Sequence, residues 1–420
     1  MLRLVNTRTL GFTGLLLLWA AAAPAQNVQT VRCRNNVPLR GMYADVTVAN
    51  GVSCTLDGAL VFGSVLVSGR GTLTAKNGTE VRGSVQVNSG GNITLAATNV
   101  LGGVILDQSG NLSVKSGSTL ANISMKKSGY LTIENSAVTD VLSTESGNVT
   151  VTNARIFPGG VTMKLSNGSL TLCGSEIGFN SETEQEGSGG VSMLETTGNL
   201  LADAGFCDPS GIQGSVVVEK GTGNVRLVGA ALNGDLAVIE QTGDVVVDGS
   251  TCNGCATVGD VKVEKGKSGD ITLKAVRTDS DATISENNGN VTIESSSLGS
   301  DVSISRNKKV VVKKNSFSLE DVHISGNGGP IEIDSNCDMR LTVNENSGAV
   351  TISNNNVPDA QNAGVTCTSG FGFSDADVTK NTGGVSIKYN TGEGLFCSDN
   401  NPAPTVSGNT ITFAGQCDDD

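Results

Sequence analysis

The sequence predicts an all-β chain that folds as one parallel β-helix, and three observations lead to this fold class. Short segments of alternating polar and apolar residues recur through the 420-residue chain, and alternation is the period of a half-buried strand. The segments fall into two classes that take turns along the chain. Undisturbed neighbours of one class are 19 or 20 residues apart, and glycine-rich turns separate the two classes.

The two classes lead into different kinds of turn. A strands, such as Ser-Val-Gln-Val at 84–87, lead into a short turn such as Ser-Gly-Asn at 146–148, where glycine allows a sharp corner. B strands, such as Asn-Ile-Thr-Leu at 92–95, number 16 and lead into a longer bend with a single apolar residue, such as Leu120. Each repeat therefore has three sides that face a shared interior.

One such repeat cannot bury its apolar side chains, whereas stacked repeats can. In a parallel β-helix each coil rises by one strand spacing of about 4.8 Å. Stacking then places like residues over like residues, which accounts for an interior of Val, Ile and Leu. Propeller repeats are about twice as long, and the hexapeptide rhythm of a left-handed β-helix gives shorter and more regular coils. We therefore expect a single domain of about 16 coils with three faces.

Coil length and strand pattern resemble those of secreted right-handed parallel β-helix proteins, the pectin-lyase-like superfamily in the broad sense, over almost the whole chain. The stretch Asp45-Val-Thr-Val-Ala-Asn-Gly-Val-Ser-Cys54-Thr-Leu is similar to the opening coil of a non-catalytic branch of such proteins. The resemblance implies a right-handed solenoid. It rests on no catalytic motif, so it implies a fold rather than an activity.

Residues 1–25 are predicted to be a signal peptide. Arg3 and Arg8 precede the apolar run from Gly14 to Ala22, and Ala23-Pro24-Ala25 supplies small residues before a cleavage site. The apolar run is shorter than the roughly 20 residues of a membrane-spanning helix. We therefore expect a secreted protein, extracellular or periplasmic, without a membrane span.

The expected mature chain has an N-terminal cap and first coil at 26–60, followed by the β-helix at 61–420. The repeat lengthens at several places, always after a B strand and before the next A strand, so the insertions are expected along one edge of the rod. These inserted loops are expected at 173–190, 203–213, 249–259, 353–376 and 388–404.

Composition excludes several classes of function. The chain has 28 Lys and Arg against 41 Asp and Glu, a net charge of −13. Without the two arginines of residues 1–25 the balance is 26 − 41 = −15. A nucleic-acid binder needs a basic surface, so we expect no nucleic-acid partner. His323 is the only histidine, which excludes a histidine-based metal site.

Ten cysteines in an exported chain indicate disulfides. The spacing does not establish their connectivity, but we expect five sequential pairs because the repeat brings chain neighbours together. Cys252-Asn-Gly-Cys255 is interpreted as a local loop disulfide, since no thioredoxin-like context and no second CxxC accompany it. The ten residues are Cys33, Cys54, Cys173, Cys207, Cys252, Cys255, Cys337, Cys367, Cys397 and Cys417.

A column of aspartates precedes five A strands, and stacking would bring successive carboxylates to within roughly 5–8 Å. Hard cations choose carboxylate oxygens, so this column is the candidate site for calcium, the one cofactor that the sequence suggests. The alternative is that each Asp accepts hydrogen bonds from its own turn. The column consists of Asp235, Asp260, Asp281, Asp301 and Asp321.

One basic cluster stands out in the acidic chain and is a candidate docking site for a polyanionic glycan. The alternative is that it protects a solvated edge of the sheet. The cluster consists of Arg306, Lys308, Lys309, Lys313 and Lys314.

Two functions remain open. The first is a non-enzymatic surface, matrix or adhesion protein, whose partner would be an extracellular polysaccharide or a surface protein. The second is a polysaccharide lyase or glycoside hydrolase of the pectinase-like type. We favour the first because the sequence has no paired-Asp strand motif near a histidine and no Arg-x-Pro-x-x-Arg pattern. No catalytic residue is assigned.

Overall fold

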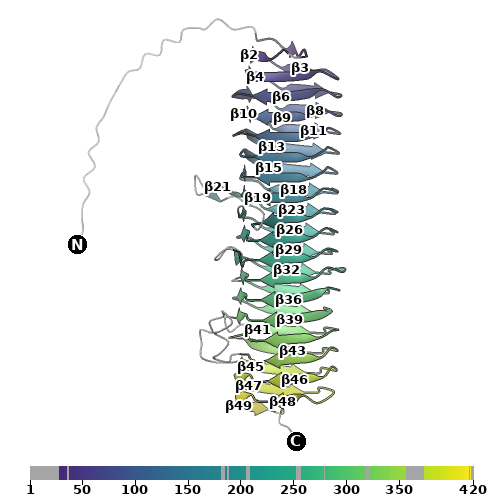
Figure 1. Cartoon of the computed structure of the whole chain (residues 1–420), viewed down its shortest axis with the longest axis vertical. Coiled ribbons are helices and arrows are strands. Elements are labelled where there is room, and N and C mark those ends of the chain that lie inside the picture. Colours follow the sequence, from purple (N-terminus) through teal and green to yellow (C-terminus); the bar gives the residue numbers. More distant parts are fainter. Residues whose placement is uncertain are drawn as a thin grey trace, which may run out of the picture.

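The computed structural model describes residues 28–35, 37–180, 185–186, 189–204, 209–251, 257–278, 280–317, 321–337, 339–355, 373–415 and 417. Within these ranges the chain is all-β and contains no helix. It forms a straight stack of parallel coils, with the N-terminal strands at one end and the C-terminal strands at the other (Figure 1). The stack is a β-solenoid of about 16 turns, which confirms the predicted fold class.

Each coil has three sides, here called the A, B and C sides. The A side consists of β1 Val31–Arg32, β3 Val46–Val48, β5 Val65–Ser68, β8 Val85–Asn88, β11 Val104–Asp107, β18 Val161–Lys164, β23 Val191–Leu194, β26 Val216–Glu219, β29 Leu236–Ile239, β32 Val261–Glu264, β35 Ala282–Ser285, β38 Val302–Ser305, β41 Asp321–Ser325, β43 Arg340–Asn344 and β45 Phe373–Thr379.

The B side comes after a short corner. It consists of β6 Thr72–Lys76, β9 Ile93–Ala96, β12 Leu112–Lys115, β14 Leu131–Glu134, β16 Val149–Thr152, β19 Leu170–Cys173, β24 Leu200–Asp203, β27 Val225–Val228, β30 Val245–Asp248, β33 Ile271–Lys274, β36 Asn290–Glu294, β39 Lys309–Lys313, β42 Ile331–Asp334, β44 Val350–Ser353, β46 Val385–Lys388 and β48 Thr405–Ser407.

The C side holds the shortest strands. They are β7 Thr79–Val81, β10 Thr98–Val100, β17 Arg155–Ile156, β20 Glu176–Ile177, β25 Gly211–Ile212, β28 Ala231–Leu232, β31 Thr257–Val258, β34 Arg277–Thr278, β37 Ser297–Leu298 and β40 Ser316–Phe317. Six longer strands turn a corner without a break: β2 Leu39–Tyr43, β4 Ser53–Val61, β13 Thr119–Lys126, β15 Ala137–Thr144, β47 Thr391–Ser398 and β49 Thr410–Gly415.

One predicted inserted loop is wrong. Residues 391–398 of the expected 388–404 insertion form β47, which pairs in parallel with β45 and β49 and so belongs to the regular stack. Within 173–190, β20 continues the C side, and β21 Phe179–Asn180 pairs antiparallel with β22 Gln185–Glu186. Residues 205–208, 252–256 and 356–372 of the other expected insertions lie outside the described residues, as do residues 1–27 with the predicted signal peptide.

Parallel register aligns the apolar side chains into columns inside the rod. Val104 pairs with Val85 on one side and with Ile123 on the other, and all three are 0–1% exposed. The apolar core is one continuous cluster that extends from Cys33 to Cys417. Burial of such side chains contributes about 1.5–3 kcal/mol each, so the core stabilises the stack along its whole length.

The corners of the coil require backbone conformations that most residues avoid. Non-glycine residues with positive φ recur after A strands and after B strands, for example Glu286 (φ 58°), Arg306 (φ 56°) and Lys314 (φ 56°). A left-handed backbone costs a non-glycine residue roughly 1–2 kcal/mol. The next residue along the chain must therefore bring a compensating interaction.

In the C-terminal coils this compensation comes from buried asparagines. The N–H and Nδ2 of Asn307 donate to Oδ1 of Asn327 (2.8 and 3.2 Å). Asn327 donates in turn to Asn346, and its Nδ2 also donates to the carbonyl of Ile304 (3.3 Å). Each amide thus uses both donors and both lone pairs of its oxygen, as burial of a polar group requires.

These amides form two ladders, one at each side of the B face. The A–B ladder consists of Asn287, Asn307, Asn327, Asn346, Asn381 and Asn400. The B–C ladder consists of Asn315, Asn336, Asn355, Asn390 and Asn409. The N-terminal coils use hydroxyls at the same positions, where the N–H of Ser109 donates to Oγ of Ser128 (3.3 Å) and the N–H of Ser128 to Oγ of Ser146 (3.2 Å).

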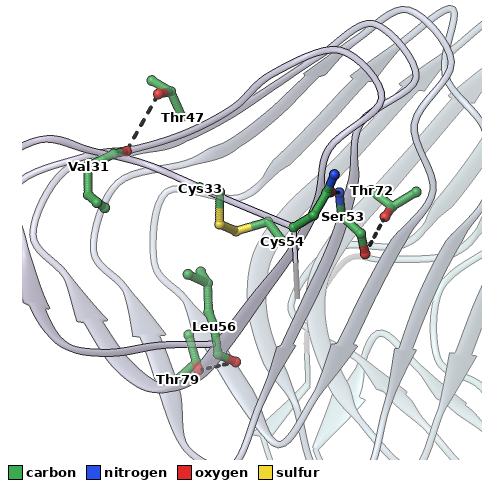
Figure 2. Close-up of a disulfide and its surroundings, with 9 residues drawn as sticks. Val31, Cys33, Thr47, Ser53, Cys54, Leu56, Thr72 and Thr79 are labelled. Atoms are coloured by element: carbon green, nitrogen blue, oxygen red, sulfur yellow. Dashed lines mark hydrogen bonds between the residues drawn. A yellow bond between two sulfur atoms is a disulfide. The ribbon is translucent and has the colours of Figure 1, made fainter. Parts of the chain in front are cut away.

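Disulfides fasten both ends of the stack, as the sequential-pair prediction requires. Cys33 and Cys54 are bonded across the first coil (Figure 2), with a Cα–Cα distance of 5.6 Å, and Cys397 is bonded to Cys417 at 5.1 Å. Both distances are ordinary for a disulfide. Cys173 and Cys337 are also disulfide-bonded, whereas the other four cysteines lie outside the described residues.

Asn327→Ala should lower the free energy of unfolding by at least about 2 kcal/mol, because it leaves buried donors on Asn307 unsatisfied. The measurement is the urea midpoint followed by far-UV circular dichroism, with amide hydrogen exchange to localise the loss. Asn288→Ala is the matched control, since Asn288 is exposed at the same corner and its side-chain amide donates to the carbonyl of Lys267. Equal midpoints for the two variants would contradict a stabilising role of the ladder.

Candidate functional site

A groove crosses the corner between the B and C sides in the N-terminal half of the rod. It extends over four stacked coils, from Gly117 to Glu176, with a volume of about 450 Å³. A smaller hollow of about 190 Å³ adjoins it on the C side and shares Thr119, Ala137 and Arg155 with it. The two together form the candidate site.

Small residues at the corner produce the groove. Asn135 and Asn153 adopt positive φ (both 46°) and are exposed. The next residues along the chain, Ser136 and Ala154, are short and buried. The hydroxyl of Ser136 donates to the carbonyl of Glu134 (2.8 Å), so this buried hydroxyl is satisfied within the chain.

An ion pair forms the wall of the groove on the C side. Arg155 on β17 and Glu176 on β20 are in register on adjacent coils, with Nε 3.0 Å from Oε2. Their side chains are 25% and 34% exposed. Ala137 and Gly211 occupy the same column immediately before and after them. The pair therefore stands between two short residues and presents guanidinium and carboxylate groups to a ligand.

The groove offers hydroxyls, amides and one neutralised ion pair, together with a little apolar surface. Its formal charge from Arg155 and Glu176 is zero. This chemistry suits an uncharged, hydroxyl-rich polymer better than a polyanion. The groove was not predicted from the sequence, because the only feature considered on the C side was one apolar residue in each bend. The available signal was the run of Ser, Thr, Asn and Ala at these bends.

The predicted aspartate column lies on one edge of the rod, but backbone donors occupy its carboxylates. The N–H of Asp260 donates to Oδ1 of Asp235 (3.0 Å), and the N–H of Asp321 donates to Oδ1 of Asp301 (3.4 Å). The sequence-based alternative placed such donors in the same turn, whereas here they come from the next coil.

Two further side chains interact with aspartates of this column. The hydroxyl of Ser300 donates to Asp281 (2.6 Å), and Arg340 pairs with Asp321 at 2.9 Å. Among the described residues, no group of three or more His, Cys, Asp and Glu side chains could hold a metal ion. Calcium binding by the column stays a prediction.

The predicted basic cluster is divided between two corners. Lys309 and Lys313 are at opposite ends of β39, so the five side chains do not form one patch. Two of them are also neutralised, because Arg306 pairs with Glu286 at 2.8 Å and Lys313 with Glu294 at 3.5 Å. The geometry therefore weakens the polyanion-docking hypothesis.

Comparison with known proteins assigns no relatives. No family model, no curated protein and no solved structure matches the chain. The resemblance to pectin-lyase-like proteins therefore stays a prediction, and the parallel solenoid is established by the strand pairing. No helix among the described residues is long and apolar enough to cross a membrane.

Two carboxyl groups on the B side have lowered pKa values. Hydrogen bonds from Asn77 (2.6 Å) and Arg40 (2.6 and 3.0 Å) lower the pKa of Asp57. For Asp248, burial raises the pKa, but hydrogen bonds from Ser250 and the charge of Lys274 outweigh it and the net shift is downward. Both groups favour the folded state while they are ionised.

Asp57→Asn should reduce the acid sensitivity of the N-terminal coils. Because the folded pKa of Asp57 is lowered from 3.8, its stabilisation is present above that pH and is lost as the pH falls below it. The variant should melt below the parent at pH 7 and approach it as the pH falls below 3.8, in a melting-temperature series. Arg40→Ala removes the same ion pair, so the two effects should not add. A gap that does not narrow at acid pH would contradict the assignment.

Proposed function

We propose that the protein is a non-enzymatic extracellular rod that binds a hydroxyl-rich polysaccharide along the groove at the B–C corner. The observation that carries the proposal is the groove itself, which spans four coils from Gly117 to Glu176 and is lined by small residues, asparagines and one ion pair. A polymer rich in hydroxyls matches a surface that offers hydroxyl, amide, guanidinium and carboxylate groups over several stacked coils.

The rest of the chain supports a role in the extracellular matrix or in adhesion. Disulfides at both ends of the stack suit an oxidising compartment. The ionisable groups near the groove are paired with each other, as Arg155 is with Glu176, an arrangement that serves recognition better than proton transfer. The second candidate function, a polysaccharide lyase or hydrolase, would bind the same kind of polymer but would also release cleavage products.

The test is a glycan array with the purified chain, with and without calcium, combined with an assay for reducing-end and unsaturated products. We expect retention on a neutral polysaccharide without product. Release of product would replace the binding function with the lyase or hydrolase function. Absence of retention on every glycan would overturn the proposal.

Ala137→Arg should weaken glycan retention at least tenfold, because it fills the centre of the groove and removes no hydrogen bond. Ala231→Arg is the matched control, since Ala231 occupies the same column four coils further on and lies outside the groove. Both variants should keep the parent melting temperature. Equal retention by the two variants would place the binding surface elsewhere.

A further inference from the structure

The A side of the N-terminal coils carries a column of outward residues in which large apolar and small or polar side chains alternate. Leu66, Ile105 and Leu142 are 37%, 45% and 37% exposed. Gln86 lies between the first two, and Ser124 lies between the last two. The column continues to Thr162. None of its members is charged, in a chain with a net charge of −13.

A second column at the preceding corner widens this apolar surface. Phe62 and Leu101 are 40% and 53% exposed, and the guanidinium of Arg82 lies 4.8 Å from the centre of the Phe62 ring. Phe157 belongs to the same corner column and is partly exposed. Exposed apolar side chains gathered on one side in this way are typical of an interaction site.

We propose that this strip binds the same strip of a second copy of the chain, with the two rods antiparallel. A two-fold axis along the strand direction, midway between the coils of Ile105 and Ser124, places each large side chain over a smaller one. Ile105 then faces Ser124 of the second copy, and Leu142 faces Gln86. Such an interface is self-complementary, as two-fold pairing requires.

The same two-fold rotation also applies to the corner column and to the next outward column of the A side. At the corner, the rotation relates the position of Phe62 to that of Phe157, which also lines the smaller hollow on the C side. Asp107 and Lys126 come two residues after Ile105 and Ser124 and are both exposed. The axis therefore sets Asp107 against Lys126 of the second copy, twice per dimer. Opposite charges at these positions fix the register of the pairing.

The size of the strip predicts a weak dimer. Six coils at about 4.8 Å give a length of about 29 Å, and the seven residues from 62 to 68 at about 3.3 Å, less the corner, give a width of about 20 Å. Each copy would bury roughly 550 Å², or about 1,100 Å² in total. This is at the low end for specific interfaces, so we expect reversible association at high micromolar concentration.

The test is sedimentation velocity of the full chain over a concentration series up to about 1 mM. Asp107→Lys and Lys126→Asp should each weaken dimerisation at least fivefold, because like charges then face each other. The double variant should recover the parent affinity, since the charges are exchanged but still opposite. Ile105→Lys should abolish the dimer, whereas Thr292→Lys on the B side should leave it unchanged.

Three outcomes would overturn the proposal. The first is a parent chain that stays monomeric throughout the series. The second is a double charge variant no better than the single ones, which would exclude this antiparallel register. The third is equal weakening by Ile105→Lys and Thr292→Lys, which would show that added charge rather than the strip controls association.

Discussion

In-register stacking is the constraint on which the rest of this structure depends. A parallel solenoid sets each residue directly over its equivalent in the next coil, so every side chain must tolerate a neighbour of its own kind. Valine and isoleucine do so by packing. The amide of asparagine does so by hydrogen bonding, because it is both donor and acceptor, as the bond from Asn307 to Asn327 illustrates. The ladder offsets the strained corner beside it and satisfies buried polar groups at the same time.

Two side chains of the same charge repel each other, so a column of identical charges on the surface of the rod would be unfavourable. At the A–B corner, acidic and basic residues alternate from coil to coil through Glu195, Lys220, Glu240, Lys265 and Glu286. Lys220 lies 4.0 Å from Glu195. Each exposed pair stabilises the fold by a small amount, but a slip of one coil would put like charges together. The alternation therefore specifies the register as well as the surface.

The sequence was sufficient for the fold and insufficient for the site, for physical reasons. In segments such as Val85-Gln86-Val87, apolar and polar residues alternate with a period of two, which is the period of a strand. Asn327 was not recognised as buried, because an asparagine after a strand equally indicates a turn. The strand 391–398 was mistaken for an insertion because Thr-Gly-Glu-Gly lacks an apolar alternation. Arg155 and Glu176 come together through stacking of the C side, where two-residue strands leave almost no pattern.

The asparagine ladder has a direction, and that direction matters while the chain is being made. Asn307 passes its donors to Asn327, and Asn327 to Asn346, always toward the C-terminus. Synthesis proceeds in the same direction. The asparagine donors of the newest coil therefore have no acceptor until the next coil is added. An exposed coil end of this kind is a template for further strand pairing. The bond between Cys397 and Cys417 fastens the coil at the C-terminal end of the described stack.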